Sequence, residues 1–346
     1  MIKVLLLGVG GNVTQGILKA IRRAPIDTEV IGACISPLSS GLYMCDEAII
    51  SPYAADNDFL PWLVEICNSR NIDIIMTGVE ENICAIAKQY DYFSAHTKAI
   101  FITSDYEKLQ IGQDKYLTCK WLKENDCNYP PYCLLDEVDN VKKMAKEEGF
   151  PLIIKPRCGK GAMGVHIIED EKELDKYIGI SGYVLEKCIG TPESEYTVGC
   201  YCDKNGILQD IIIMRRRLKN GTTVYAKVVD NEAIRMETKK IVERLKPSGA
   251  FNIQLRLDSN GRPFSFEFNM RFSGTTAMRS AFGYCDVEAM LKEYVLNEKI
   301  DDCFNIKYGE AFRYDEEMYI FDDSVREMED SGELSGIKDR RIVKGY

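Results

Sequence analysis

The first hundred residues alternate apolar runs of strand length with amphipathic runs of helix length, and this alternation restricts the fold more than any other feature. Strands are expected at Lys3–Val9, Glu29–Ile35, Ile72–Thr77 and Ala99–Thr103, and helices at Thr14–Arg23, Phe59–Arg70 and Asn82–Tyr92. Such alternation predicts a doubly wound parallel sheet with any ligand at the carboxyl edge of the strands.

The turn after the first strand is rich in glycine, but it does not match the dinucleotide fingerprint. Gly8, Gly10 and Gly11 fall in this turn, and Val13 stands where that fingerprint needs another glycine. A nicotinamide cofactor is therefore not expected. At the end of the third strand, Glu80 is a candidate substrate residue. The alternative is that it only complements the dipole of the helix that it begins.

A second strong pattern is a buried strand that delivers a lysine to a glycine-rich loop. Residues 151–156 read PLIIKP, and Lys155 precedes a loop that contains Gly159, Gly161 and Gly164. Glycines let backbone N–H groups close over phosphate oxygens, and the lysine adds a positive charge. No GK[ST] sequence opens a helix here, so this is not a Walker loop. The alternative, a mobile hairpin tip, leaves the lysine on an apolar strand unexplained.

The stretch PFSFEFNMRFSGTT at residues 263–276 reads as a half-buried strand. Phenylalanines alternate with polar residues, which places Ser265, Glu267 and Asn269 on one face, followed by Arg271. A carboxylate and an amide oxygen suit a hard cation such as Mg²⁺, and the arginine suits a phosphoryl group. The alternative is a solvated strand face with ordinary charge alternation.

The triplet Arg215–Arg217 lies on a later strand, where alternate residues face opposite sides. Arg217 is the preferred candidate for binding a substrate carboxylate, against the alternative of a solvated strand edge.

Composition excludes several classes of protein. The formal net charge is −10, and no basic stripe is present to follow a nucleic acid, so no nucleic-acid partner is expected. No apolar run approaches the length of a signal peptide core or of a membrane span, which predicts a cytoplasmic protein without a membrane partner. The thirteen cysteines include no CxxC pair, and with two histidines a zinc site is not expected.

Taken in order, these motifs resemble the ATP-grasp superfamily, and within it the branch similar to the large subunit of carbamoyl-phosphate synthetase. The resemblance runs from the first βα unit to about Asn297. It implies a Rossmann-like pre-ATP-grasp domain at residues 1–104, a small subdomain with the glycine loop at 105–185, and a C-terminal subdomain with the metal site and an acidic tail at 186–346. The fold class is thus α/β followed by two α+β subdomains.

The resemblance also assigns nucleotide-binding roles to single positions. Lys155 and Lys115 match the basic residues that bind phosphates beside the glycine loop. The hinge whose backbone and side chains hold adenine is matched by Glu186, Lys187, Cys188 and Ile189. Glu195 matches the acid that accepts from the ribose hydroxyls.

The resemblance likewise assigns residues to the metal ions and to the transferred phosphoryl group. Gln254, Glu267 and Asn269 match the oxygens that hold Mg²⁺ or Mn²⁺, with two ions expected, and Arg271 matches the arginine that meets the transferred phosphoryl group. Lys155, Asn269 and Arg271 are the expected catalytic residues. The chain departs from the synthetase pattern at Gly274, where the family has another basic residue, which puts bicarbonate chemistry in doubt.

The family chemistry implied is ATP-dependent ligation of a small carboxylate to an amine or ammonia through an acyl phosphate, in a possible homodimer. Three alternatives are bicarbonate or carbamate phosphorylation, phosphorylation without ligation, and a non-catalytic ATP-binding subunit. The last class would be expected to have lost Lys155, Glu267 or Asn269, and all three are present.

Overall fold

The computed structural model describes residues 1–159, 161 and 163–344. Lys160 and Ala162, within the predicted glycine loop, and residues 345–346 of the predicted C-terminal subdomain lie outside the described residues. Two compact units are present, one of residues 1–106, 271–307 and 314–346, the other of residues 107–270 and 308–313. The predicted boundaries divide the chain differently, because residues 186–346 are shared between both units.

The first unit is built on a six-stranded sheet in the order β17-β3-β2-β1-β4-β5. Its strands are β1 (Ile2–Leu7), β2 (Thr28–Cys34), β3 (Glu47–Ile50), β4 (Ile74–Thr77), β5 (Ile100–Phe101) and β17 (Glu333–Leu334). All neighbours are parallel except β17, which runs antiparallel to β3. β1 and β4 are almost entirely buried, as expected of central strands covered on both faces.

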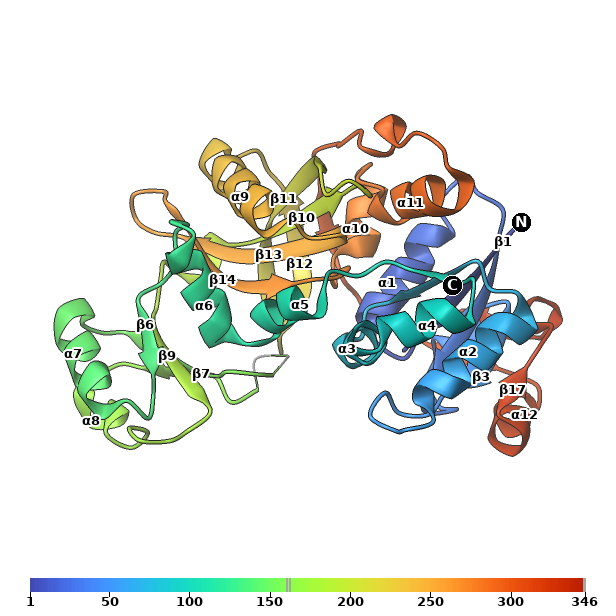
Figure 1. Ribbon diagram of the computed structural model, residues 1–346, viewed down its shortest axis with the longest axis horizontal. Coiled ribbons are helices and arrows are strands. Elements are labelled where there is room, and N and C mark those ends of the chain that lie inside the picture. Colours follow the sequence, from blue (N-terminus) through green and yellow to red (C-terminus); the bar gives the residue numbers. More distant parts are fainter. Residues whose placement is uncertain (160, 162, 345–346) are drawn as a thin grey trace. The chain divides into compact units, whose positions relative to one another are not determined.

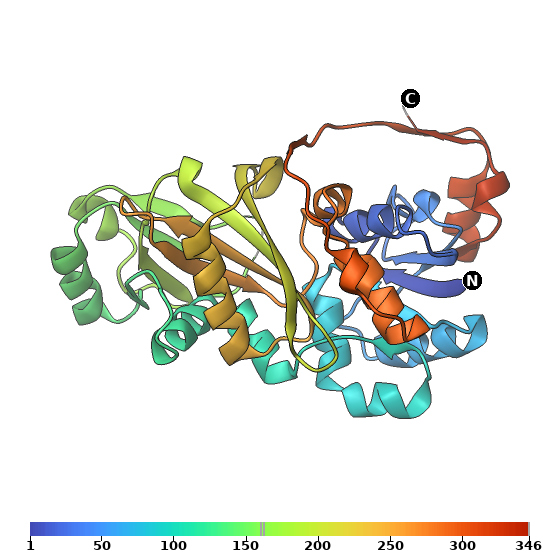
Figure 2. The ribbon, with the colours of Figure 1, turned by 90° about the horizontal axis from the view of Figure 1, so that it is seen from above.

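Helices cover both faces of this sheet, as the alternating sequence predicted. Figure 2 shows α1 on one side of the blue strands and the cyan helices that follow α2 on the other. The helical segments from the first hundred residues are α1 (Asn12–Ile21), η1 (Leu42–Met44), α2 (Phe59–Arg70), α3 (Glu80–Lys88) and α4 (Tyr90–His96). Those from the later part of the chain are α10 (Thr276–Ala281), α11 (Asp286–Leu291), η3 (Lys292–Leu296), η4 (Asp301–Cys303), α12 (Ser324–Ser331) and η5 (Ile337–Asp339).

The helical segment that begins at Thr276 is interrupted. α10 and α11 pack against α1, and a break separates them at Gly283. Gly283 has φ +80°, and a Cβ there would lie 2.0 Å from the carbonyl oxygen of Asn305. Only glycine fits this close backbone approach, so the helix cannot continue through it. A separate two-stranded sheet of β16 (Met318–Ile320) and β18 (Ile342–Lys344) belongs to the same unit.

The second unit contains two antiparallel sheets (Figure 1). The smaller has the order β6-β9-β7-β8, with β6 (Tyr132–Leu134), β7 (Leu152–Pro156), β8 (His166–Ile168) and β9 (Tyr183–Lys187). Its core includes Leu152, Ile154 and Leu185 together with Val141 and Met144 of α7 (Val138–Glu148). A short helix, α8 (Glu171–Leu174), completes this subdomain.

The larger sheet has the order β14-β13-β10-β11-β12-β15. Its strands are β10 (Glu195–Cys202), β11 (Leu208–Lys219), β12 (Thr222–Val228), β13 (Gly249–Leu257), β14 (Pro263–Asn269) and β15 (Glu310–Phe312). The helical segments of this part are α5 (Tyr106–Gln113), which begins at the boundary between the units, α6 (Lys115–Glu124), η2 (Pro192–Ser194) and α9 (Glu232–Leu245). α6 and α9 pack on the sheet, where Trp121 meets Phe268 edge to face.

No helix in the described ranges is both long and apolar enough to cross a membrane.

Candidate functional site

A cavity of about 200 Å³ in the second unit brings most of the predicted site residues together. Residues of both sheets and of the glycine loop line it. Among the predicted residues these are Lys115, Lys155, Gly159, Gly161, Glu186, Lys187, Ile189, Glu195, Gln254 and Glu267. Residues more than 150 positions apart therefore contribute to one site.

The walls of the cavity combine apolar surface with charge. Side chains of Ile153, Val165, Leu218, Phe264 and Phe266 supply flat or branched apolar surface, which suits a planar ring. Five basic and three acidic side chains also line it: Lys115, Lys155, Lys187, Arg216, Arg256, Glu186, Glu195 and Glu267. Even without Lys187, whose ammonium binds backbone carbonyls elsewhere, the basic side chains exceed the acidic ones by one, which contrasts with the chain's net charge of −10 and favours an anionic ligand.

A buried ion pair lies on the side of the smaller sheet. Lys155 Nζ donates to Glu186 Oε2 at 2.6 Å, and the two residues are 8% and 1% exposed. The same ammonium lies 4.7 Å from the centre of the Phe266 ring. The other oxygen of Glu186, Oε1, is buried without a hydrogen-bond partner among the described residues. Because an unpaired buried acceptor is costly, this oxygen is a natural position for a ligand N–H group.

The start of α6 is fixed against the strand that leads to the glycine loop. Asp114 caps α6 by accepting from the backbone N–H groups of Tyr116 and Leu117. Its carboxylate also binds the Arg157 guanidinium through both oxygens, with a shortest distance of 2.6 Å. This contact raises the pKa of the Arg157 guanidinium. Lys115 follows the cap, and its Nζ lies 3.2 Å from the carbonyl oxygen of Gly159, so it is held beside the loop.

Glycine is required at one end of this loop. Gly164 has φ +71°, and a Cβ there would come within 2.9 Å of Pro156 Cγ. It is the one predicted loop glycine that is not among the cavity-lining residues, and it forms the base of the loop next to β7.

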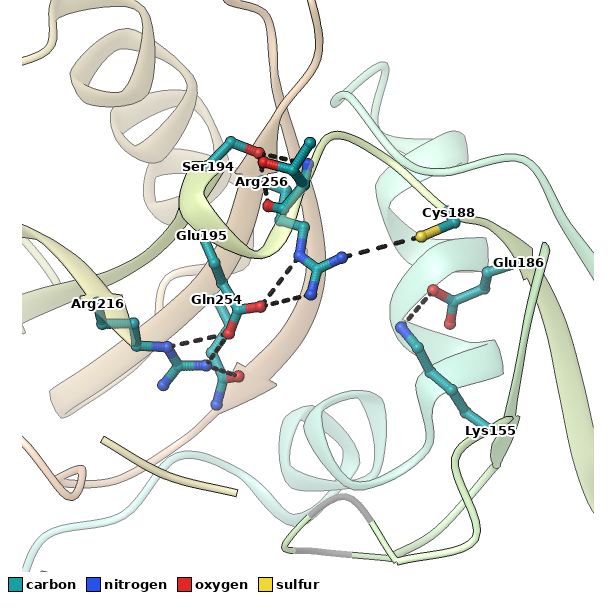
Figure 3. A network of polar contacts seen from close by, with 9 residues as sticks. Lys155, Glu186, Cys188, Ser194, Glu195, Arg216, Gln254 and Arg256 are labelled. Carbon is teal, nitrogen blue, oxygen red and sulfur yellow. Dashed lines mark hydrogen bonds and ion pairs between the residues drawn. The ribbon is translucent and has the colours of Figure 1, made fainter. Parts of the chain in front are cut away.

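On the side of the larger sheet, a carboxylate is held by two guanidinium groups (Figure 3). Glu195 Oε1 accepts from Arg216 at 2.8 and 3.2 Å, and Oε2 accepts from Arg256 at 2.8 and 3.0 Å. Burial raises the pKa of Glu195, but the two guanidinium groups outweigh it, so the pKa lies below its usual value. The Cys188 thiol, which also lines the cavity, lies 3.9 Å from Arg256 Nη1.

The expected metal-binding positions form a hydrogen-bonded group around Glu267. Its Oε1 accepts from Gln254 Nε2 at 2.9 Å and from Asn269 Nδ2 at 3.2 Å. Gln254 Oε1 accepts from Arg216 Nη2 at 2.5 Å, so the predicted ligand oxygen of Gln254 is already occupied. Glu267 Oε2 and Asn269 Oδ1 are the oxygens that would meet a cation. Among the described residues, no three His, Cys, Asp or Glu side chains form a metal-binding group, so such a cation would depend on this donor set and on ligand oxygens.

The alternation predicted for β14 is interrupted by a bulge. Glu267 pairs with Gln254 and Ser265 with Leu255, which leaves Phe266 as the extra residue. Phe264, Phe266 and Glu267 all line the cavity, whereas Ser265 is fully buried elsewhere. The prediction that Ser265 shares a face with Glu267 is therefore wrong, because a bulge shifts the side-chain period by one.

The structure corrects one further prediction. Arg216, and not Arg217, faces the cavity, because Arg216 is 7% exposed while Arg217 lies on the exposed face of β11. Lys187 lines the cavity as predicted for the hinge, but its ammonium is bound elsewhere. It donates to the carbonyl oxygens of Glu148 and Gly149 at 3.0 and 3.2 Å, which satisfies the end of α7.

Two predicted residues lie in the first unit. Arg271 donates through Nε and Nη2 to Glu80 Oε1 at 3.1 and 2.7 Å, and through Nη1 to the carbonyl of Phe272 at 2.9 Å. Glu80 is thus a partner of Arg271, an arrangement that the sequence reasoning missed. Arg256 was also missed, and nothing in its sequence context distinguishes it from an ordinary strand residue.

Family models match three consecutive parts of the chain. The model for the ATP binding domain of the carbamoyl-phosphate synthase L chain matches residues 114–191. The model described as ATP-grasp in the biosynthetic pathway with Ter operon matches residues 190–311. This chain carries an ATP-grasp domain. The N-terminal residues 4–100 match the PylC-like N-terminal domain, which confirms the predicted order of an N-terminal α/β domain and an ATP-grasp fold.

Individual relatives agree with this identification. The arginine-specific large chain of carbamoyl phosphate synthase from Cutaneotrichosporon cutaneum is 25% identical over 311 residues, which are 82% of this chain and 26% of that protein. The ATP-grasp chain described here thus spans about a quarter of the length of the synthase large chains that it matches.

Solved structures share the fold. N5-carboxyaminoimidazole synthetase from Staphylococcus aureus, complexed with ADP, is 18% identical, with a TM-score of 0.68 over 95% of this chain and 85% of that chain. The biotin carboxylase–β-γ-ATP complex from Campylobacter jejuni is 20% identical, with a TM-score of 0.67 over 84% of this chain and 70% of that chain. At these identities the likeness establishes the fold alone.

Proposed function

We propose that this protein is an ATP- and Mg²⁺-dependent ligase that joins a small carboxylate to an amine or to ammonia. The reaction would transfer the γ-phosphoryl group of ATP to the carboxylate, and the amine would then displace phosphate from the acyl phosphate. ADP and phosphate are the expected by-products. The observation that carries the proposal is the cavity in which a lysine, a glycine loop and the Glu267 group meet.

The cavity fits an adenine nucleotide on several independent grounds. Its apolar walls suit a planar base, and the unpartnered Glu186 Oε1 suits the exocyclic amino group of adenine. Lys155 and Lys115 lie beside the glycine loop, where phosphate oxygens would be expected. The solved structures of the same fold reported above include an ADP complex and a β-γ-ATP complex.

Each residue has a defined task in this proposal. Lys155 and Lys115 would hold phosphate oxygens and offset the negative charge that repels an incoming carboxylate. Glu267 and Asn269 would hold Mg²⁺ (or Mn²⁺), which when bound supplies charge neutralisation to the β- and γ-phosphates. The glycine loop would exclude water and so protect an acyl phosphate from hydrolysis. Arg271, paired with Glu80, stays a candidate for contact with the transferred group.

The proposal is tested by ADP release from MgATP against a panel of amino acids, dipeptides, sugar acids and bicarbonate, each with and without ammonia. ADP formation that depends on one carboxylate and one amine is the expected result. Glu267→Ala should abolish it, whereas Glu193→Gln, at an exposed position outside the cavity, should not. Turnover with bicarbonate alone would favour carbamoyl-phosphate-like chemistry. Absence of Mg²⁺-dependent ATP binding would overturn the proposal.

Cytoplasmic location and a homodimer stay predictions. Light scattering of the purified protein tests the second.

A further inference from the structure

The acceptor capacity of Glu195 is already filled by arginine. The residue is 6% exposed, and its two oxygens accept four hydrogen bonds, two from Arg216 and two from Arg256. An ionised carboxylate offers about four lone-pair positions. A ribose hydroxyl could therefore bind Glu195 only by displacing a charged guanidinium, which makes a stronger hydrogen bond than a hydroxyl does. The arrangement conflicts with the ribose-binding role that the sequence implied.

Arg216 connects Glu195 to the hydrogen-bonded group around Glu267. Its Nη2 donates both to Glu195 Oε1 and to Gln254 Oε1 (Figure 3). Because a guanidinium has no acceptor, the Gln254 amide must turn its oxygen towards Arg216 and its NH₂ towards Glu267. That NH₂ donates a hydrogen bond to Glu267 Oε1. The orientation of the Glu267 carboxylate thus depends on Arg216, and the position of Arg216 depends on Glu195.

We infer that Glu195 is a positioning residue that fixes Arg216 and Arg256 and, through Arg216 and Gln254, sets the orientation of the Glu267 carboxylate towards Mg²⁺. It is not the acceptor for the ribose hydroxyls. The inference rests on the proposed function, because it concerns the same nucleotide site. The lowered pKa of Glu195 agrees with it, since a carboxylate must stay ionised to hold two guanidinium groups.

The experiment measures equilibrium binding of ATP, 2′-deoxy-ATP and 3′-deoxy-ATP to wild type, Glu195→Gln and Glu193→Gln over a range of Mg²⁺ concentrations. Glu193 is a matched control, since it precedes Glu195 by two residues but is fully exposed and outside the cavity. In Glu195→Gln we expect the ratio of deoxy-ATP to ATP dissociation constants to stay within about twofold of wild type. The Mg²⁺ concentration for half-maximal ATP binding should rise at least threefold. Glu193→Gln should change neither quantity.

The opposite result is equally well defined. A hydrogen bond to a charged acceptor accounts for a preference of about tenfold or more. If wild type shows such a preference for ATP and Glu195→Gln abolishes it, Glu195 is the ribose acceptor and the inference is wrong. An unchanged Mg²⁺ dependence in Glu195→Gln would also overturn the inference, because Glu195 would then have no influence on how Glu267 binds Mg²⁺.

Two measurements keep the outcomes separable. Thermal unfolding without nucleotide shows whether Glu195→Gln is folded; if it is not, Arg216→Lys replaces it. This variant keeps the charge but cannot bridge Glu195 and Gln254 in the same way, and we expect it to raise the Mg²⁺ requirement at least threefold as well. An unchanged Mg²⁺ requirement in Arg216→Lys would refute the proposed connection from Glu195 to Glu267. Failure of wild type to bind ATP would contradict the proposed function itself, a result distinct from the others.

Discussion

Separation of the Lys155–Glu186 pair should destabilise the second unit strongly. Both side chains are at least nine-tenths buried, and their charged atoms lie 2.6 Å apart. Lys155→Met keeps the length of the side chain but leaves the Glu186 carboxylate buried without a counterion, with Oε1 already unpartnered. Breaking a buried pair from one side costs about 3–5 kcal/mol. At about 2–4 °C per kcal/mol for a unit of this size, the melting temperature should fall on the order of 10 °C.

Removal of both charges should restore much of the lost stability. In Lys155→Met/Glu186→Gln no charge is left uncompensated, so we expect a smaller loss than in either single variant. The assay is a double-mutant cycle by thermal unfolding without nucleotide. Lys227 and Glu310 provide the matched control, because they form a 2.9 Å pair in which both partners are 42% exposed. The same cycle at that pair should show no measurable coupling, because water screens it.

One result would refute the reasoning. If Lys155→Met lowers the melting temperature no more than Lys227→Met does, the Glu186 carboxylate is solvated or protonated in the folded protein. The electrostatic description of the cavity would then be incorrect.

Three further predictions follow from the site. Gly164→Ala should weaken ATP binding about 5–30-fold in a titration, because the left-handed conformation costs an alanine about 1–2 kcal/mol and its Cβ meets Pro156. Because the pKa of Glu195 is lower in the folded than in the unfolded protein, its ionised form stabilises the fold above the unfolded pKa, near 4.5. This stability is lost as the pH falls through the folded pKa, so the melting temperature of Glu195→Gln should depend less on pH in the acid range than that of wild type. Finally, ATP should slow alkylation of Cys188, which lines the cavity, and leave Cys84 unaffected as judged by peptide mass spectrometry.

Much of the fold was predictable from the order of apolar and amphipathic segments along the chain. The bounds of α2 match the prediction residue for residue, and Asn71, in the left-handed conformation, gives the helix a defined end. β3 was missed, because its four residues are too few to show a period. The short β6 and β8 were missed for the same reason.

Side-chain direction was harder to predict than element type. Residues 211–214 of β11 are all buried, so the apolar pattern does not indicate which face of the strand meets the cavity, and Arg217 was preferred over Arg216. In β14 the bulge at Phe266 is a matter of pairing with β13, which no single strand's sequence reveals. The double contact of Glu195 with arginines 21 and 61 residues away is likewise a tertiary feature.

The antiparallel pairing of β17 with β3 also has a consequence for synthesis on the ribosome. β17 places Leu334 opposite Ala48, and Arg70 joins Glu47 to Glu333 through ion pairs of 3.1 and 2.6 Å. More than two hundred residues separate the end of the first continuous segment, at Tyr106, from this strand. At about 5–20 residues per second, the β3 edge stays open for on the order of 10–45 s after the rest of its sheet has emerged. During that interval an unpaired strand edge is available to other chains, so the nascent protein is most exposed to misassembly before β17, the last strand of this sheet, arrives.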